Sequence, residues 1–214
     1  EVWVMFAIGR RGLILGASAL ALGGVLSACD RGGAAGAAEG EMVLGDANAP
    51  VTLTEYASTT CPHCAEFHEA TWDQLKTNYI DTGRIKFVFR EFPTAPAPVA
   101  VAGFQVARCG GATPEQYFTR VGEIFRTQAG LFQSIQVDAG RGYFVNLGQA
   151  AGLSEDQVLQ CIGDESGAAR VRRMVEAGER DGVTGTPTFL INGTKFEQAP
   201  TYENLSRALD AAGA

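Results

Sequence analysis

Two cysteines separated by Pro62 and His63 constrain this chain more than any other feature. Cys61 and Cys64 follow a run of apolar and β-branched residues, 51–56, that predicts a strand, and they open a segment that predicts a helix. Thiols at positions i and i+3 lie on one face of a helix, near enough to close a small disulfide ring. Pro62 suits the first helical position, because its ring fixes φ and no partner would exist there for an N–H. The pattern therefore predicts a redox-active cysteine pair at a helix N-terminus.

The same position predicts unequal thiols. Cys61 would lie at the positive end of the helix dipole, which favours the thiolate, and His63 can add a cationic or donor group. Two other uses of the pair stay open: an inert structural disulfide, or half of a zinc site. A structural zinc site needs four ligands, whereas the chain has only His63 and His68 as histidines and no second closely spaced cysteine pair. We therefore expect no metal and no cofactor.

The N-terminus predicts an exported protein. We expect translation to start at Met5, after which Arg10 and Arg11 precede a short apolar run, 13–26, typical of a signal peptide rather than a membrane span. Residues 26–29, Leu-Ser-Ala-Cys, resemble the lipobox of bacterial lipoproteins. We predict that residues 1–29 are a signal peptide and that Cys29 is the lipidation site. Cleavage near residues 35–37, and export by the twin-arginine instead of the general secretory route, stay open.

The remaining pattern is an interrupted β/α order. Gly- and Ala-rich residues 30–42 predict a flexible tether, with a short edge strand around 42–44. Strand patterns at 51–56 and 85–92 flank a helix that runs from Pro62 to about Tyr79, and three prolines close this part. A long helical stretch follows, with capping boxes that begin at Thr113 and Ser154. The last elements are a hairpin around Asn192-Gly193 and a helix capped by Thr201.

We therefore predict an α/β domain formed by residues 43–95 and 182–214, interrupted by a helical insertion at 96–181. Cys109 and Cys161 both fall in the insertion, and we pair them; two buried free thiols are the alternative. A disulfide that closes a loop of about 50 residues stabilises by roughly 4 kcal/mol in the chain-entropy model. We expect His68 to be a surface histidine, and Arg172 and Arg173 to belong to a solvated helix face.

With Cys61-Pro62-His63-Cys64 and Gly185-Thr186-Pro187-Thr188 both present, the chain resembles the DsbA family of periplasmic thiol oxidoreductases over residues 43–214. The resemblance implies a thioredoxin fold interrupted by a helical insertion. It implies an enzyme that introduces disulfides into exported proteins and is reoxidised by a membrane redox partner. The second cysteine pair resembles that of alphaproteobacterial members.

The resemblance also implies residue roles. Cys61 would be the exposed nucleophile, Cys64 the buried partner that resolves the mixed disulfide, and His63 the group that stabilises the Cys61 thiolate. Pro187 would be cis, which would leave the backbone of Thr186 free to pair with an extended substrate; a trans proline in a plain turn is the alternative. Glu55 would be a buried acid near Cys64 that accepts a proton, unless it points to solvent at the strand end.

Composition and motifs narrow the function. The net charge of −7 leaves no basic surface typical of nucleic-acid binding. A reductase or isomerase stays open, because isomerases of this superfamily also favour Thr at the position of Thr186, although residues 30–42 are too short for their oligomerisation region. A copper- or zinc-handling protein is the third hypothesis. We expect a periplasmic location, with the inner membrane contacted only through the lipid anchor.

Overall fold

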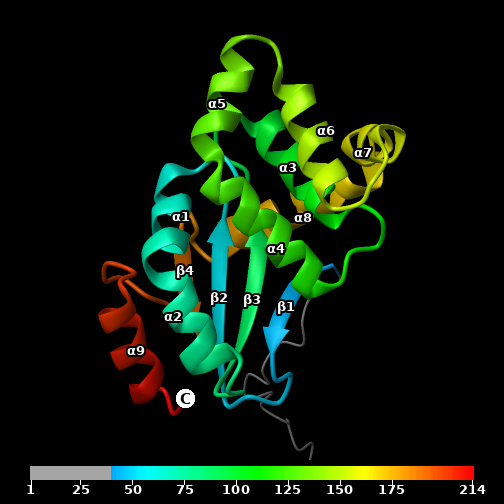
Figure 1. Cartoon of the computed structure of the whole chain (residues 1–214). Helices are drawn as coiled ribbons and strands as arrows, with labels where there is room; N and C mark the ends of the chain where they lie inside the picture. The colour runs from blue at the N-terminus through cyan, green and yellow to red at the C-terminus, as the bar shows by residue number, and fades with distance from the viewer. Residues whose placement is uncertain (1–39) are drawn as a thin grey trace, which may run out of the picture. The chain divides into compact units, whose positions relative to one another are not determined.

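The computed structural model describes residues 40–214. The predicted signal peptide, Cys29 and most of the tether lie outside the described residues. The described chain builds a five-stranded sheet in the order β1-β3-β2-β4-β5, and Figure 1 shows helices packed around it. The strands are β1 (Met42–Gly45), β2 (Val51–Ala57), β3 (Ile85–Glu91), β4 (Thr188–Ile191) and β5 (Thr194–Lys195).

Strand β2 is the centre of the sheet. It pairs in parallel with β3 and antiparallel with β4, so that Glu55 lies opposite Phe89 on one side and Phe189 on the other. Parallel strands need a crossover connection, and the helical segment after Cys61 supplies it. The chain therefore leaves the carboxyl end of the central strand directly into the Cys61–Cys64 motif.

The crossover runs from Pro62 to Ile80, as predicted, but its hydrogen-bond pattern alternates. The α-helical parts are α1 (Pro62–Phe67) and α2 (Asp73–Leu75), and the π-helical parts are η1 (His68–Trp72) and η2 (Lys76–Ile80). Phe67, Leu75 and Tyr79 all point into the core, as the sequence predicted. His68 and Thr71 of η1 are also buried.

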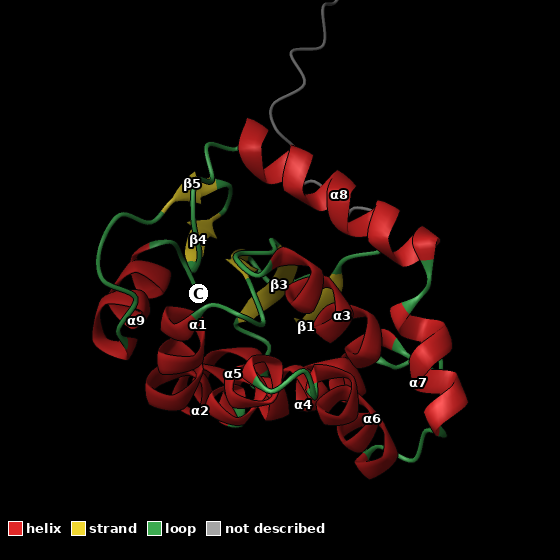
Figure 2. Ribbon diagram, turned by 90° about the horizontal axis from the view of Figure 1, so that it is seen from above, coloured by secondary structure: helices red, strands yellow, loops and turns green. Residues whose placement is uncertain are grey.

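Helices cover both faces of the sheet, so strands β2 and β3 are buried on both sides. Figure 2 shows α8 on one side and α1, α2 and α4 on the other. The helices that follow β3 are α3 (Ala97–Arg108), α4 (Pro114–Arg126), α5 (Gln128–Gln136), α6 (Gly140–Ala150), α7 (Glu155–Ile162) and α8 (Glu165–Arg180), and α9 (Tyr202–Ala211) ends the chain. Both predicted capping boxes, at Thr113 and Ser154, are present.

The helices between β3 and β4 share the sheet's core and add a second one. Phe118 and Val121 of α4 pack into the cluster that contains Leu53 and Phe87. A separate cluster joins α3 through α7, with fully buried side chains Val106, Ile124, Leu131 and Val158. This part of the chain is consequently held against the sheet by its own apolar residues.

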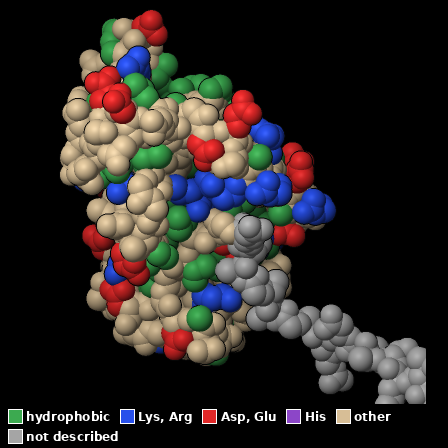
Figure 3. All heavy atoms as spheres, turned by 90° about the vertical axis from the view of Figure 1, so that its right-hand side faces the viewer, with side chains coloured by type: hydrophobic (Ala, Val, Ile, Leu, Met, Phe, Trp, Pro, Cys, Tyr) green, Lys and Arg blue, Asp and Glu red, His purple; other side chains and the backbone are tan. Residues whose placement is uncertain are grey.

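The predicted hairpin and the predicted solvated helix face are confirmed. Asn192 and Gly193 have φ values of 49° and 81°, the left-handed conformation that a two-residue hairpin turn of this hand requires. Arg172 and Arg173 of α8 are exposed. The face in Figure 3 carries a band of Lys and Arg side chains, although the chain as a whole is acidic. Among the described helices, none is both long and apolar enough to cross a membrane.

Candidate active site

Cys61 is the N-cap of α1, at the point where the loop after β2 becomes helix. Its backbone is extended, with φ −89° and ψ 117°, and its sulfur accepts a hydrogen bond from the Cys64 N–H at 3.4 Å. The loop that carries it, 58–60, is buried. Ser58 Oγ accepts from the Thr94 N–H at 3.0 Å, and Thr59 Oγ1 donates to the Ala100 carbonyl at 3.1 Å. Side-chain hydrogen bonds therefore fix the position of the cysteine before the helix begins.

A loop distant in sequence meets Cys61. Cys61 Sγ lies 3.2 Å from the Thr186 carbonyl oxygen, to which the thiol donates while it carries its proton, across a separation of 125 residues. The Thr186–Pro187 peptide is cis, not trans, and it leads directly into β4. The structure thus brings together the two motifs that the sequence singled out.

The two thiols, both free in this structure, have opposite environments. The hydrogen bond from the Cys64 thiol lowers the pKa of Cys61 to about 6, although burial opposes this effect. A hydrogen bond with the Thr186 side chain and the backbone N–H groups of Cys64 and His63 lower the pKa of Cys61 as well. Burial raises the pKa of Cys64 well above its usual value, and the hydrogen bond to Cys61 and the charge of Glu55 raise it further. The pair therefore consists of one thiolate and one neutral thiol at neutral pH.

The expected exposure of Cys61 is wrong. Only 5% of Cys61 is accessible, against none of Cys64, because Cys61 lies beneath the Thr186–Pro187 loop. Cys61 remains the member of the pair that an incoming group can reach.

His63 lies on the solvent side of α1 and turns toward Glu66. Its Nδ1 is 2.8 Å from Glu66 Oε2, and this hydrogen bond, together with the charges of Glu66 and Cys61, raises the pKa of His63. The backbone N–H of His63 is among the groups that lower the pKa of Cys61.

Glu55 and His68 form a buried pair. Glu55 is inaccessible to solvent, so the alternative that it points outward at the strand end is wrong. The expectation for His68 is also wrong: it is 9% exposed, with Nε2 3.3 Å from Glu55 Oε2. One helical turn after Cys64, His68 lies on the same inward face, and the carboxylate supplies the partner that a buried imidazole needs.

Gln128 is a site residue that no motif in the sequence indicated. It is buried at the start of α5, and its Nε2 donates to the carbonyl oxygens of Thr59 and Cys61 at 3.0 and 3.1 Å. It lies 67 residues after Cys61, so only the folded chain reveals the contact.

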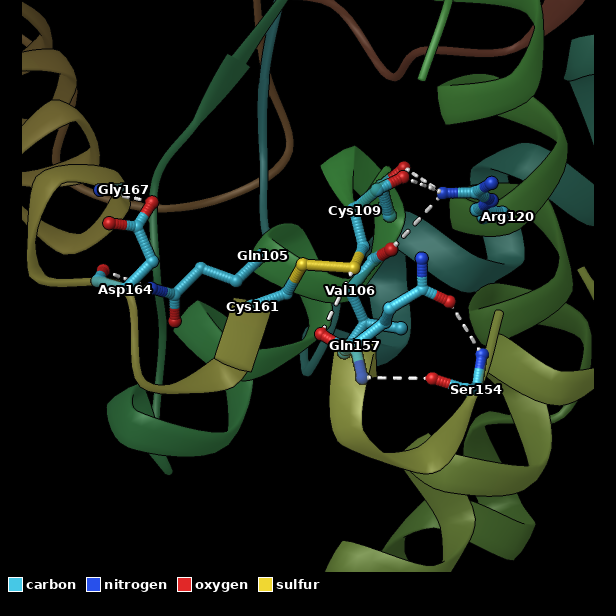
Figure 4. Close-up of a disulfide and its surroundings, with 10 residues drawn as sticks. Gln105, Val106, Cys109, Arg120, Ser154, Gln157, Cys161, Asp164 and Gly167 are labelled. Atoms are coloured by element: carbon cyan, nitrogen blue, oxygen red, sulfur yellow. Dashed lines mark hydrogen bonds between the residues drawn. A yellow bond between two sulfur atoms is a disulfide. The ribbon is translucent and has the colours of Figure 1, made fainter. Parts of the chain in front are cut away.

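Cys109 and Cys161 are joined by a disulfide between the end of α3 and α7, with their Cα atoms 5.7 Å apart (Figure 4). Figure 4 also shows Arg120 beside it, where Nη1 donates to the carbonyl oxygens of Val106, Ala107 and Cys109. The nearest of these contacts is 2.7 Å, to Cys109. Arg120 thereby satisfies the carbonyls that the end of α3 leaves without helical partners.

Across residues 40–214 no group of three or more Cys, His, Asp or Glu side chains is arranged to hold a metal ion. His63 is engaged by Glu66 and His68 by Glu55. The described site therefore has two thiols for exchange with another thiol or disulfide, but no third side chain placed to complete a metal site with them.

Comparisons with known proteins agree with this geometry. A family model described as Thioredoxin matches residues 37–211. A Rickettsia conorii protein named "Putative protein-disulfide oxidoreductase" is 32% identical over 175 residues, which cover 81% of this chain and 61% of that protein. Its counterpart in Rickettsia prowazekii is 31% identical over 175 residues and covers 81% and 62%. The chain thus spans about three-fifths of the length of these relatives.

Solved structures share the fold. Wolbachia pipientis alpha-DsbA1 superposes with a TM-score of 0.73 at 24% identity, covering 82% of this chain and 92% of that one. Bacillus subtilis BdbD in its oxidised form gives a TM-score of 0.67 at 20% identity, covering 80% and 92%. The predicted fold class, an α/β thioredoxin fold interrupted by a helical insertion, is confirmed by the sheet and by these neighbours. The chain belongs to the thioredoxin family, and its fold is the one found in DsbA proteins.

Proposed function

We propose that this protein is a thiol:disulfide oxidoreductase that introduces disulfides into exported proteins through Cys61 and Cys64. The observation that carries the proposal is the asymmetry of the two thiols: the pKa of Cys61 is lowered to about 6 and that of buried Cys64 is raised. A stabilised thiolate favours the reduced pair, which makes the corresponding disulfide an oxidant. The names of the Rickettsia relatives support the same reaction class.

The proposed reaction begins with the Cys61–Cys64 disulfide. A substrate thiolate attacks Cys61 Sγ, the bond to Cys64 breaks, and Cys64 leaves as a thiolate that takes up a proton. A second substrate thiolate then attacks the substrate sulfur of the mixed disulfide, and Cys61 leaves as the stabilised thiolate. Two electrons pass from the substrate dithiol to the cysteine pair, and the substrate gains a disulfide.

The other site residues take supporting roles in this proposal. The charge of His63 would favour the Cys61 thiolate, and Glu55 would exchange a proton with Cys64. The Thr186 backbone beside Pro187 would pair with an extended substrate segment by strand addition. Residues 43–95 and 182–214 would form the thioredoxin-like domain, with 96–181 as its insertion, and no cofactor would be needed.

The cellular part of the proposal rests on the sequence. The substrates would be reduced or unfolded exported proteins in the periplasm. A membrane redox partner would reoxidise the pair, and a lipid on Cys29 would anchor the protein to the inner membrane. Labelling with a radioactive fatty acid, lost in Cys29→Ser, would support the anchor; unlabelled wild-type protein would exclude it.

A reductase or isomerase is the second candidate, favoured by one observation. Thr186 precedes the cis Pro187, and isomerases of this superfamily also favour Thr at that position. The equilibrium of the pair with a glutathione buffer, in protein without Cys29, decides between them. A potential above about −150 mV supports the oxidase, and one near −230 mV or lower assigns a reductase. Metal that copurifies under reducing conditions would instead favour metal handling.

A further inference from the structure

Glu55 is a buried acid whose two oxygens differ. Oε2 contacts His68 Nε2 at 3.3 Å, whereas Oε1 has no hydrogen-bond partner among residues 40–214. Both residues are in the interior, on β2 and η1. A buried carboxylate is stable only when it is bonded or paired, and an oxygen without a partner is a ready acceptor for a proton.

His68 is the only cationic or hydrogen-bond-donating side chain of the described residues that reaches Glu55. Its ring is held by aromatic neighbours: Trp72 stacks on it with centroids 4.9 Å apart, Phe125 lies at 4.4 Å, and Phe67 meets it edge-on at 5.4 Å. The imidazole is therefore fixed in direction and is the group that decides how well Glu55 holds a negative charge.

Other charged groups around the pair are engaged elsewhere. On α1, His63 bonds Glu66. On α4, Glu123 pairs with Arg126, and Arg120 donates hydrogen bonds to carbonyl groups at the end of α3. On α9, Glu203 pairs with Arg207.

Charged residues of β3 are also paired. Arg90 pairs with Glu41 and Asp181, and Glu91 pairs with Arg108. Lys86, also on β3, pairs with Thr52 of β2. Thr52 and Glu55 are three residues apart on the same strand, so their side chains lie on opposite faces of the sheet. Lys86 therefore faces away from Glu55. The charge of Glu55 does act on one thiol of the active site, that of Cys64.

We propose that His68 is a positioning residue for the thiol chemistry: it holds Glu55 as a carboxylate beside Cys64, so that Glu55 takes up the Cys64 proton. The inference rests on the proposed function and adds His68 to it. Without the donor, a solitary buried acid would favour its neutral form and could no longer act as a base. The charge of Glu55 is felt at Cys64, where it is one of the causes that raise the thiol pKa.

The carboxylate of Glu55 is needed when the Cys61–Cys64 disulfide forms. This step starts from a mixed disulfide between Cys61 and a bound thiol. The Cys64 thiol gives its proton to Glu55, whose Oε2 stays in contact with His68 Nε2. The Cys64 thiolate attacks Cys61 Sγ, the Cys61–Cys64 bond forms, and the bond from Cys61 to the bound thiol breaks. The bound thiol leaves as a thiolate and takes a proton from water. No external oxidant or reductant takes part.

The test measures this closure directly. Reduced protein without Cys29 is mixed with glutathione disulfide, and the mixed disulfide is followed by acid quenching and mass spectrometry from pH 5 to 10. We compare wild type with His68→Leu, which has no donor, with His68→Gln, which keeps an N–H near the position of Nε2 but cannot titrate, and with Glu55→Gln. Phe118→Leu is the packing control, because Phe118 lies in the same aromatic cluster, stacked on Trp72, without reaching Glu55.

We expect His68→Leu to slow closure at pH 7 by at least about tenfold and to move the rising limb of the profile to higher pH. The closure rates of wild type and variant should converge at high pH, where the Cys64 thiol loses its proton without help from a base. His68→Gln should restore most of the rate, and Glu55→Gln/His68→Leu should be no slower than Glu55→Gln. Should His68→Leu not fold, His68→Asn, whose amide is too short to reach Glu55, replaces it.

An unchanged pH profile in His68→Leu, equal slowing by Phe118→Leu, or additive losses in the double variant would overturn the proposal. The glutathione equilibrium potential is measured on the same samples. A low potential would remove the oxidase assignment while leaving the result for His68 intact, so the two hypotheses fail separately.

Discussion

Gln128 in α5 reaches the backbone of Cys61: its side-chain Nε2 donates to the Cys61 carbonyl oxygen at 3.1 Å. The second N–H of the same amide serves the Thr59 carbonyl. Both acceptors belong to the buried turn between β2 and α1, where water cannot replace the donor. One side chain of α5 thus donates to two buried carbonyl groups of the loop that positions Cys61.

Replacing Gln128 by Leu leaves these carbonyls without donors in a buried place. We expect the free energy of unfolding of the oxidised protein to fall by about 1–3 kcal/mol. Gln133→Leu, on the exposed side of α5, is the matched control and should change it by less than about 0.5 kcal/mol. Urea unfolding gives both values, and equal losses in the two variants would show that the contact does not stabilise the loop.

Gly103 of α3 marks a second close approach to this loop. A Cβ there would lie 2.7 Å from Thr59 Oγ1, whereas a Cβ at Gly122 of α4 would meet nothing within 4 Å. Gly103→Ala should therefore destabilise by about 1–3 kcal/mol through overpacking. Gly122→Ala should stabilise by up to about 1 kcal/mol, since Ala favours helix more than Gly does. Thermal unfolding would contradict this account if the two variants shifted the midpoint in the same direction.

The lowered pKa of Cys61 predicts how the stability of the reduced protein depends on pH. Because the pKa falls from 9.0 to about 6 on folding, the thiolate contributes stability that is fully present above pH 9. This contribution declines as the pH falls through that window and is lost below about 6. Cys64, whose pKa is raised, stays neutral in both states below about pH 8 and adds no slope there.

Unfolding in urea from pH 5 to 8, with and without reductant, checks this expectation. The stability of the reduced protein minus that of the oxidised protein should rise with pH across this range. Reduced Cys61→Ser should lose the rise. A difference that stays constant with pH would mean that Cys61 is not a stabilised thiolate in the folded protein.

The contact between His63 and Glu66 predicts that an exposed acid tunes the nucleophile. Glu66 raises the pKa of His63 and so favours the charged form of the imidazole. Glu66→Gln should lower the charge of His63 at neutral pH, and the midpoint of Cys61 alkylation by iodoacetamide should rise slightly from about 6. Glu69→Gln, exposed on the same helical segment, should leave it unchanged. A downward move would contradict the assigned role of the pair.

Local sequence patterns were sufficient to predict the secondary structure. The contacts among the side chains of the site depend on residues that only the fold brings together. The Cys-Pro-His-Cys turn, the capping boxes at Thr113 and Ser154 and the Asn192-Gly193 hairpin are all set by neighbours in sequence, and all were predicted. The burial of His68 was not, because it depends on Glu55 of β2 and on the ring of Phe125 from α4. The role of Gln128 could not be predicted for the same reason. A single glutamine forms no sequence motif, and its partners are backbone carbonyl groups, which every residue has.

The Cys109–Cys161 disulfide predicts a stability effect that is separate from the chemistry of the active site. It spans 52 residues, and a crosslink over such a loop restricts the unfolded chain by an amount equivalent to about 4 kcal/mol. We expect Cys109→Ala/Cys161→Ala to lower the free energy of unfolding by up to this amount, measured in urea with Cys61 and Cys64 oxidised. The rate of disulfide closure at Cys61 should change much less, because Cys64, Glu55 and Thr186 lie on other elements. A closure rate that falls as steeply as stability would instead mean that the disulfide also holds the active-site loop, through α3 and its contact with Thr59.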